Sequence, residues 1–285
     1  MHSKPISHIY SALAVFLIAD IVVWILVFQN NVLYDELNIY ALDVGQGDSG
    51  LIQFGNGPTI LIDAGGLNRK ARESLSQVFP LDKKYIDLLI MTHPEVDHFG
   101  GFLEILKTYE VGVFIGNGRI AESNAYPELM EMLLEKNIPY IALAENDRIS
   151  HRNAFFQILH PDVNGVLSSA LNDGSLVFMF TSGNFRALYT GDISSHIEER
   201  LIQKYDLSAH MLKVPHHGSK YSSSEAFLGE VNPDIAVIGV GKNSYGHPTK
   251  ETLDRFLKKG VLVKRTDIDG MVHLLIDENN IQIFE

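Results

Sequence analysis

An apolar strand that runs directly into a cluster of metal-binding side-chain types limits the fold of this chain more than any other part of its sequence. Ile86–Met91 is rich in isoleucine and leucine, as is typical of a strand buried on both faces of a sheet. The segment Thr92–Gly101 follows at once, with four potential metal ligands within six positions. We therefore expect the strand to end at the edge of a sheet, beside a cleft.

The four side chains of this segment are imidazoles and carboxylates, which are the ligands that zinc, manganese and iron take in proteins. They are His93, Glu95, Asp97 and His98. A tight turn after a strand can direct alternate side chains into one cleft. The alternative is that Asp97 caps a helix and the two histidines are incidental. The density of ligand types favours a metal site.

Three further polar motifs also follow predicted strands. Thr190-Gly191-Asp192 comes after the strand Phe185–Tyr189, and His216-His217-Gly218-Ser219 follows the short apolar stretch Met211–Val214. The segment from Asn243 to Pro248 follows the strand Ile235–Val240. A lone Gly-Asp turn would be ordinary. Together, polar clusters at several strand ends predict one cleft along one edge of the fold.

The chain after Asp35 alternates short strands with helices, and polar or glycine-rich turns separate them. Other expected strands are Leu37–Asp43, Ser49–Phe54, Thr59–Ile62, Ala154–Leu159, Leu176–Thr181 and Val261–Lys264. Helices are expected at Ala71–Phe79, Phe102–Tyr109 and Pro127–Lys136 and near Ser195–Tyr205. Two strand-rich halves with outer helices predict one α/β domain built as a four-layered αββα sandwich.

The order of the motifs resembles that of the metallo-β-lactamase superfamily: H-x-E-x-D-H, then G-D, then H-H-G-S, then G-H-P. Within it, Leu42–Asp48 and Asn172–Val177 are similar to segments of the hydrolase domain of the ComEC competence proteins. The resemblance covers roughly Leu37 to Glu285, and an ordered set of motifs is more specific than any one of them. It implies a metallo-β-lactamase-fold hydrolase domain over residues 36–285.

The resemblance also implies roles for individual residues. It assigns to the metal site His93, Asp97, His98, Asp192 and one of His216 and His217, with Asp63 as a structural hydrogen-bonding acid. We expect His217 to be the ligand. Glu95 stands where members usually place a second histidine and is kept in the expected ligand set, whereas Asn172 stands where another histidine ligand is common. Oxygen ligands favour harder ions, so the expected cofactors are two divalent ions, zinc or manganese.

Two ions in such a site would lower the pKa of a shared water and clamp the attacking and leaving oxygens of a displacement. The chain has no cysteine, and Ser219 lacks the G-x-S-x-G context of a serine nucleophile. We expect Asp97 to orient the attacking water, and His216 or His247 to stabilise developing charge or protonate the leaving group. His247 could instead cap the loop before Pro248.

The ComEC resemblance implies a phosphodiester substrate, with single-stranded DNA as one candidate. Expected substrate contacts are Asn172, Ser219, Asn243 and Tyr245, and Lys213, Lys220 and Lys242 flank the motifs and could contact phosphate. The net charge of −12 argues against broad electrostatic attraction to nucleic acid. The alternatives are hydrolysis of a cell-envelope phosphoester, such as a phosphocholine ester, and a non-catalytic metal-binding module. Protein partners are not indicated.

The N-terminal part, residues 1–35, differs from the rest because Ile9–Phe28 is an apolar run of twenty residues whose only formal charge is Asp20. At ~1.5 Å per residue a helix of this length covers ~30 Å, so it predicts a single uncleaved transmembrane anchor. Lys4 precedes the run, which favours a cytoplasmic N-terminus and an extracytoplasmic catalytic domain. A cleaved signal peptide, giving a secreted protein, and a buried core helix are the alternatives.

Overall fold

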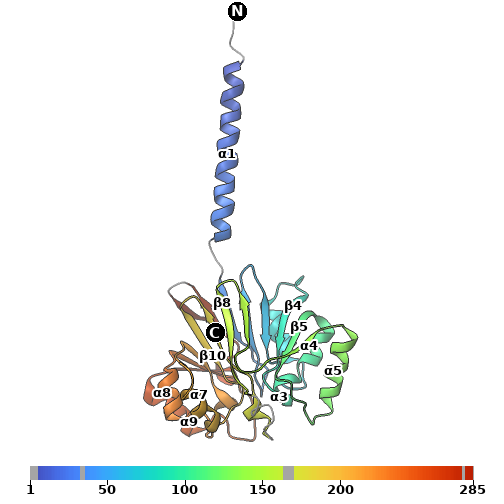
Figure 1. Cartoon of the computed structure of the whole chain (residues 1–285), viewed down its shortest axis with the longest axis vertical. Coiled ribbons are helices and arrows are strands. Elements are labelled where there is room, and N and C mark those ends of the chain that lie inside the picture. Colours follow the sequence, from blue (N-terminus) through green and yellow to red (C-terminus); the bar gives the residue numbers. More distant parts are fainter. Residues whose placement is uncertain (1–5, 33–35, 163–169, 278–279, 285) are drawn as a thin grey trace, which may run out of the picture.

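The structure is a computed structural model and describes residues 6–32, 36–162, 170–277 and 280–284. Two β-sheets stack face to face, and helices cover the outer face of each sheet (Figure 1). The four layers therefore run helix, sheet, sheet, helix, and the predicted αββα sandwich is confirmed.

The larger sheet has, in the described chain, eight strands in the order β15-β14-β1-β2-β3-β4-β5-β6. They are β1 (Leu37–Ala41), β2 (Gly50–Phe54), β3 (Thr59–Ile62), β4 (Tyr85–Ile90), β5 (Glu110–Gly116), β6 (Tyr140–Ala142), β14 (Val272–Ile276) and β15 (Ile281–Phe284). β3, β4, β5 and β6 pair in parallel. Their carboxyl ends therefore meet at one edge of the sheet.

The smaller sheet has seven described strands in the order β13-β12-β11-β10-β9-β8-β7. They are β7 (Arg148–His151), β8 (Ala154–His160), β9 (Val177–Ser182), β10 (Phe185–Tyr189), β11 (Met211–Lys213), β12 (Ile235–Ile238) and β13 (Leu262–Arg265). β10 to β13 pair in parallel. This sheet thus presents a second row of strand carboxyl ends.

Apolar side chains fill three layers of core. Between the sheets, alternate strand residues such as Ile39, Phe156 and Phe180 are buried, and the rings of Phe156 and Phe180 lie 4.8 Å apart between centroids. Outside the larger sheet pack α2 (Lys70–Val78), α4 (Phe102–Thr108) and α5 (Ala125–Glu135). Outside the smaller sheet pack α7 (Ser195–Ile202), α8 (Glu225–Val231) and α9 (Lys250–Lys259). Burial of these apolar faces holds the layers together.

Most predicted strands and helices are present in the structure, with bounds that differ by a few residues. Several strands of the structure were not predicted from the sequence. β14 is an example: it pairs with β1, with Val272 opposite Ala41. This pairing joins the two ends of the domain, and no sequence pattern near either strand predicts it. The strand predicted over Leu37–Asp43 ends at Ala41, because the chain then enters a loop in which the amide of Leu42 donates to the carbonyl oxygen of Ser49 at 2.9 Å.

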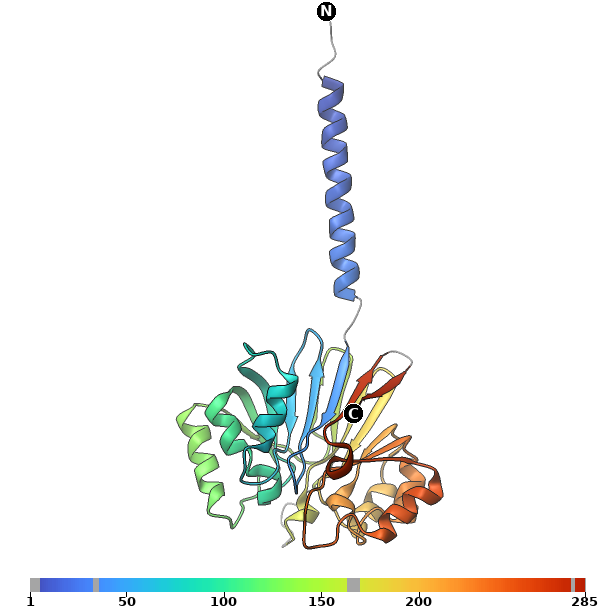
Figure 2. The same cartoon turned by 180° about the vertical axis from the view of Figure 1, so that it is seen from behind.

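The N-terminal helix α1 (Ile6–Val32) extends away from the sheets in both views (Figure 2). The side chains of residues 10–25 are described, and all are exposed. Ile9 and residues 26–28 of the predicted membrane span lie outside the described side chains. Within the part of the chain that the structure describes, no helix combines the length and the apolar character needed to cross a membrane. The predicted anchor over Ile9–Phe28 is therefore not supported.

A close backbone contact joins the loops that follow β3 and β4. The amide of Ala64 donates to the carbonyl oxygen of His98 at 2.7 Å. A Cβ atom at Gly101 would lie 1.9 Å from the carbonyl oxygen of Ala64. Only glycine fits at this position, so the two loops are held at a fixed separation.

We expect the substitution Gly101→Ala to lower the free energy of unfolding by about 1–3 kcal/mol, because the backbone must move to relieve the overlap. Gly229→Ala in α8 is the matched control: there a Cβ atom meets nothing nearer than 3.6 Å, and alanine favours a helix. Urea unfolding measures both. An unchanged midpoint for Gly101→Ala would contradict the proposed contact.

Candidate metal centre

The candidate ligands stand on loops at the carboxyl ends of strands from both sheets. β4 leads through His93 to the short helix α3 (Val96–Phe99), which carries Asp97 and His98. α3 lies at the end of the sandwich opposite to α1 (Figure 1). Asp192 follows β10 of the smaller sheet, and His217 follows β11. The stacking of the sheets thus brings distant parts of the sequence to one edge.

The backbone separates the two adjacent histidines. His216 and His217 both adopt the left-handed conformation, with φ of 52° and 51°, which non-glycine residues adopt rarely and at a cost. The turn directs His217 inward, where it is 2% exposed. His216 remains partly exposed. The structure therefore places His217, rather than His216, among the buried candidate ligands.

Four of the predicted ligands converge. The Nε2 atom of His98 lies 3.3 Å from an Asp192 carboxylate oxygen, and the Nε2 atom of His217 lies 3.3 Å from the same oxygen. The Nε2 atom of His217 is also 3.3 Å from a carboxylate oxygen of Asp97. The ring of His93 lies beside that of His98, with 4.1 Å between centroids. The ligands come from both halves of the chain.

These residues fit a divalent ion on two counts. Two ligand atoms bound to one tetrahedral zinc at ~2.1 Å lie ~3.4 Å apart, close to the spacing found here. The Nε2 atoms of His93, His98 and His217 and the Oδ1 atom of Asn172 are buried without a hydrogen-bond partner. Buried polar atoms are normally paired, so the unpaired nitrogens of these three histidines are what a cation site requires.

The far side of each imidazole ring is fixed. The Nδ1 atom of His98 lies 2.8 Å from Asp63, whose carboxylate also accepts bonds from the amide and the hydroxyl of Thr92, at 2.8 and 2.7 Å. The Nδ1 atom of His217 lies 2.7 Å from the carbonyl oxygen of Gly239. Such contacts fix the orientation of a ligand ring and turn its Nε2 atom toward the metal.

Carboxylates make the centre strongly attractive to cations. Burial acts to lower the pKa of His217, but the charges of Asp192 and Asp48 outweigh burial and raise the pKa to about 10. Burial and the neighbouring His98 lower the pKa of His93 to about 3, so this ring is neutral. In the metal-free protein a proton on His217 balances part of the negative charge. A divalent ion can take the place of that proton.

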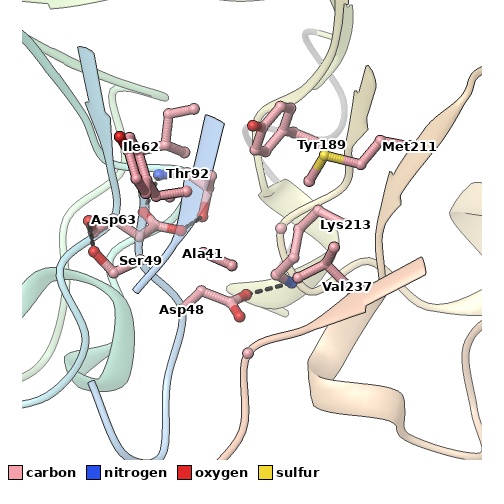
Figure 3. Close-up of a pocket in the computed structure, with 14 residues that line it drawn as sticks. Ala41, Asp48, Ser49, Ile62, Asp63, Thr92, Tyr189, Met211, Lys213 and Val237 are labelled. Atoms are coloured by element: carbon pink, nitrogen blue, oxygen red, sulfur yellow. Dashed lines mark hydrogen bonds and ion pairs between the residues drawn. The ribbon is translucent and has the colours of Figure 1, made fainter. Parts of the chain in front are cut away.

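Asp48 lies beside this group, although the sequence analysis did not assign it to the site. One ligand atom each from Asp48, His98, Asp192 and His217 lies within 4.8 Å of the others. Asp48 forms an ion pair with Lys213 between the two sheets (Figure 3). Lys213 was one of three lysines that could contact phosphate. The structure does not favour that role, because Lys213 is 9% exposed and is paired with Asp48. The sequence feature that could have identified Asp48 is the glycine-rich segment Leu42–Asp48, which ends at this residue.

Two other predicted residues lie beside this group. Burial raises the pKa of Glu95, and the nearby charge of Asp97 raises it further, so Glu95 lies within the field of the site but outside the tight cluster. Asn172 begins a 3₁₀ turn, Asn172–Gly174, and its carbonyl oxygen accepts a bond from Ser175 at 2.7 Å. The hydroxyl oxygen of Ser175 in turn accepts from the amide of Asp192. This link connects the Asn172 turn to the centre.

A row of rings leads from the centre to the surface. The ring of His216 lies 6.2 Å from that of His217 and 5.4 Å from that of His247. Tyr245 follows, 5.8 Å from His247, and is 74% exposed. The Nδ1 atom of His247 is buried without a hydrogen-bond partner. These three side chains form the open side of the site.

Two residues predicted to bind substrate make hydrogen bonds within their own loops. The side chain of Asn243 accepts bonds from the amides of Tyr245 and His247, both at 3.1 Å, and donates to two carbonyl oxygens of its own loop. Ser219 is 1% exposed, and its hydroxyl oxygen accepts from the amide of Tyr221. The structure thus places Asn243 and Ser219 inside the loops that border the cleft.

Comparison with known proteins agrees with this geometry. A family model described as the metallo-beta-lactamase superfamily matches residues 42–242. The chain is similar to ComE operon protein 3 of Bacillus subtilis, at 29% identity over 272 residues that cover 88% of this chain and 34% of that protein. Recombination protein 2 of Haemophilus influenzae is 31% identical over 250 residues, which cover 85% of this chain and 29% of the relative. The chain spans about a third of the length of these curated relatives.

Solved structures support the fold alone. YhfI of Bacillus subtilis, described as a metallo-beta-lactamase fold protein, aligns with a TM-score of 0.55 at 12% identity. The alignment covers 83% of this chain and 99% of that chain.

The geometry predicts that divalent ions stabilise the protein through His217 and not through His216. In the chelator-treated full chain, Mn²⁺ or Zn²⁺ at a hundred times its Kd should add about 2.7 kcal/mol to the free energy of unfolding. His217→Ala should lose most of this gain, because its ring offers a buried ligand nitrogen, whereas His216→Ala should keep it. Thermal unfolding with and without metal measures the difference. Equal losses in the two variants would contradict the assignment.

Proposed function

This chain belongs to the metallo-beta-lactamase superfamily, and from that membership we propose that residues 36–285 form a metal-dependent hydrolase domain that cleaves phosphodiesters, with DNA as the favoured substrate. The observation that carries the proposal is the convergence of buried, unpartnered imidazole nitrogens on the carboxylates of Asp97 and Asp192. A site of this kind suits an enzyme that activates water and needs no nucleophilic side chain.

The relatives support a nucleic acid substrate. One of them is named Recombination protein 2, and recombination is a reaction of DNA. The chain covers only about a third of these proteins, so activity on DNA in this chain is part of our proposal. A phosphodiester also suits the site, since divalent ions bound there would supply a Lewis acid for phosphoryl oxygens and lower the pKa of water.

In this proposal Asp97 orients and deprotonates the attacking water. Burial alone would raise the pKa of Asp97, but its contact with His217 and the charge of His98 lower it, so Asp97 is ionised at neutral pH. The side chain of Asp97 is also 34% exposed, whereas those of Asp48, Asp63 and Asp192 are at most 5% exposed. An ionised, accessible carboxylate can orient the attacking water and accept its proton.

His247 and His216 are suited to the leaving side of the reaction. Burial lowers the pKa of His247, and the adjacent His216 lowers it further, so the neutral ring predominates at pH 7. A neutral imidazole can donate a hydrogen bond from one ring nitrogen to the oxygen on which charge develops. Both rings lie on the side of the centre that leads to solvent.

Exposed aromatic side chains beside the site favour a substrate with bases. Tyr245 is 74% exposed, and Tyr221 is 68% exposed with the Lys220 ammonium 5.1 Å from its ring centroid. The loop that carries Tyr221 is held by Arg255, which donates to three carbonyl oxygens of residues 220–223. A rigid loop with an aromatic ring and a cation is typical of single-strand nucleic acid binding through base stacking.

We expect Asp97→Asn to lower kcat by ~10²–10⁴-fold, because the variant can no longer take a proton from the attacking water. Asp254→Asn is the matched control, since this exposed carboxylate pairs only locally, with Lys250 at 2.6 Å. The assay compares single-stranded DNA, double-stranded DNA, bis-p-nitrophenyl phosphate and a phosphocholine ester.

Hydrolysis of the phosphocholine ester alone would favour a cell-envelope substrate. Metal binding without hydrolysis of any substrate would point to a non-catalytic binding module. Full activity of Asp97→Asn would remove the assigned role of Asp97.

Tyr245→Ala should raise the KM for single-stranded DNA by ~5–150-fold, which corresponds to one lost stacking contact of ~1–3 kcal/mol. The KM for bis-p-nitrophenyl phosphate should change little. Tyr245→Trp keeps an aromatic ring and should keep the wild-type KM for single-stranded DNA. Tyr85→Ala is the control, because Tyr85 is also exposed but starts β4 at the opposite end from the metal centre. Equal effects on both substrates would mean that Tyr245 acts on the centre and not on bases.

A further inference from the structure

We propose that Lys213 is a positioning residue: its buried ion pair with Asp48 holds that carboxylate behind the ligand histidines and out of the metal's coordination shell. The inference rests on the metal site of the proposed function. It does not depend on the substrate, because the Asp48–Lys213 pair lies on the inner side of the centre.

The pair joins the two halves of the sandwich. Asp48 lies in the loop between β1 and β2 of the larger sheet, and Lys213 is the last residue of β11 in the smaller sheet. Asp48 is 4% exposed and Lys213 is 9% exposed. The Lys213 ammonium also donates to the carbonyl oxygen of Val214 at 2.7 Å. Solvent therefore contributes little to screening of either charge, and each charge depends on the other.

Asp48 approaches the histidines from the side away from the ligand nitrogens. Its carboxylate oxygens lie 3.5 Å from the Nδ1 atom of His217 and 3.9 Å from the Nδ1 atom of His98. Asp97 and Asp192, in contrast, meet the Nε2 atoms of these rings. Both Nδ1 atoms have a nearer hydrogen-bond partner, the carbonyl oxygen of Gly239 at 2.7 Å and Asp63 at 2.8 Å. Asp48 therefore acts on the rings through its charge, which favours the approach of a cation.

Backbone packing limits the position of Asp48 on one side. A Cβ atom at Gly239 would lie 2.2 Å from the Asp48 carboxylate. The amide of Asp48 donates to the carbonyl oxygen of Asp97 at 3.3 Å, and the amide of Gly65 donates to the carbonyl oxygen of Asp48 at 2.9 Å. The backbone of Asp48 is thus tied to the loops that carry the ligands.

On the other side the carboxylate faces open space. A cavity of about 30 Å³ lies between the sheets and is lined by Asp48, Lys213 and Tyr189 among others (Figure 3). This volume has room for about two water molecules. The Tyr189 hydroxyl is buried without a hydrogen-bond partner. The cavity thus leaves space beside the Asp48 carboxylate, and on this side the carboxylate is paired with Lys213.

The test uses the full chain with Co²⁺ as the probe. It compares the wild type with Asp48→Asn, Lys213→Met and the double variant, and Lys136→Met, at an exposed position after α5, is the matched control. For each protein, the number of bound ions, the Kd and the visible absorption spectrum of the Co²⁺ complex are measured. The spectrum reports the number and kind of ligands, which a merely structural role would not change.

We expect Asp48→Asn to keep the ion count of the wild type and to raise the Kd by ~10–100-fold, as for other residues that orient ligands. Lys213→Met should change the Co²⁺ spectrum, because the freed carboxylate can reach the ion. The double variant should match Asp48→Asn in spectrum and Kd, since Lys213 acts through Asp48. Lys213→Arg keeps the charge and should keep the wild-type spectrum.

Three results would overturn the inference. Loss of a bound ion in Asp48→Asn would make Asp48 a ligand, and additive effects in the double variant would show that Lys213 acts independently of Asp48. A wild-type spectrum for Lys213→Met would show that the ion pair does not hold the carboxylate. If Lys213→Met does not fold, the inference is still tested by the number of ions bound to Asp48→Asn and by the Co²⁺ spectrum of Lys213→Arg. Failure of the wild type to hydrolyse phosphodiesters would count against the proposed function and leave these readouts unaffected.

Discussion

Buried carboxylates at the junction of the two sheets set the main constraint on this structure. Asp48, Asp63 and Asp192 are each less than 5% exposed. Removing such a group from water costs several kcal/mol unless a positive partner or hydrogen bonds replace the lost solvation. The described partners are His98, His217 and Lys213. A divalent ion at the centre would complete this charge balance, so metal binding and folding are linked at this edge.

The same contacts connect the two halves of the molecule. His98 meets Asp192, Asp97 meets His217, and Asp48 meets Lys213. In each pair one residue follows or precedes a strand of the larger sheet, and the other belongs to or follows a strand of the smaller sheet. The apolar core holds the sheets together over their faces, and these charged pairs align their edges. A change in sheet packing would therefore move ligands relative to one another.

The centre has two different sides. On the inner side, Asp48 and Lys213 border a small cavity between the sheets and are shielded from solvent. On the outer side, His216, His247 and Tyr245 lead to the surface. The inner side can set how tightly an ion is held, whereas the outer side can select what approaches it. This division allows substrate preference to change in the border loops while the metal site stays intact.

The sequence alone determined the sandwich, most of its strands and the polar motifs at strand ends, because hydrophobic patterns and turn residues are local signals. Tertiary structure decided the rest. Only the folded turn after β11 showed that His217 is buried while His216 remains partly exposed. Likewise, nothing near Asp48 in sequence reveals Lys213, which lies on the other sheet. Pairing of distant buried charges depends on how the two sheets stack, and no local sequence pattern encodes the relative position of residues on different sheets.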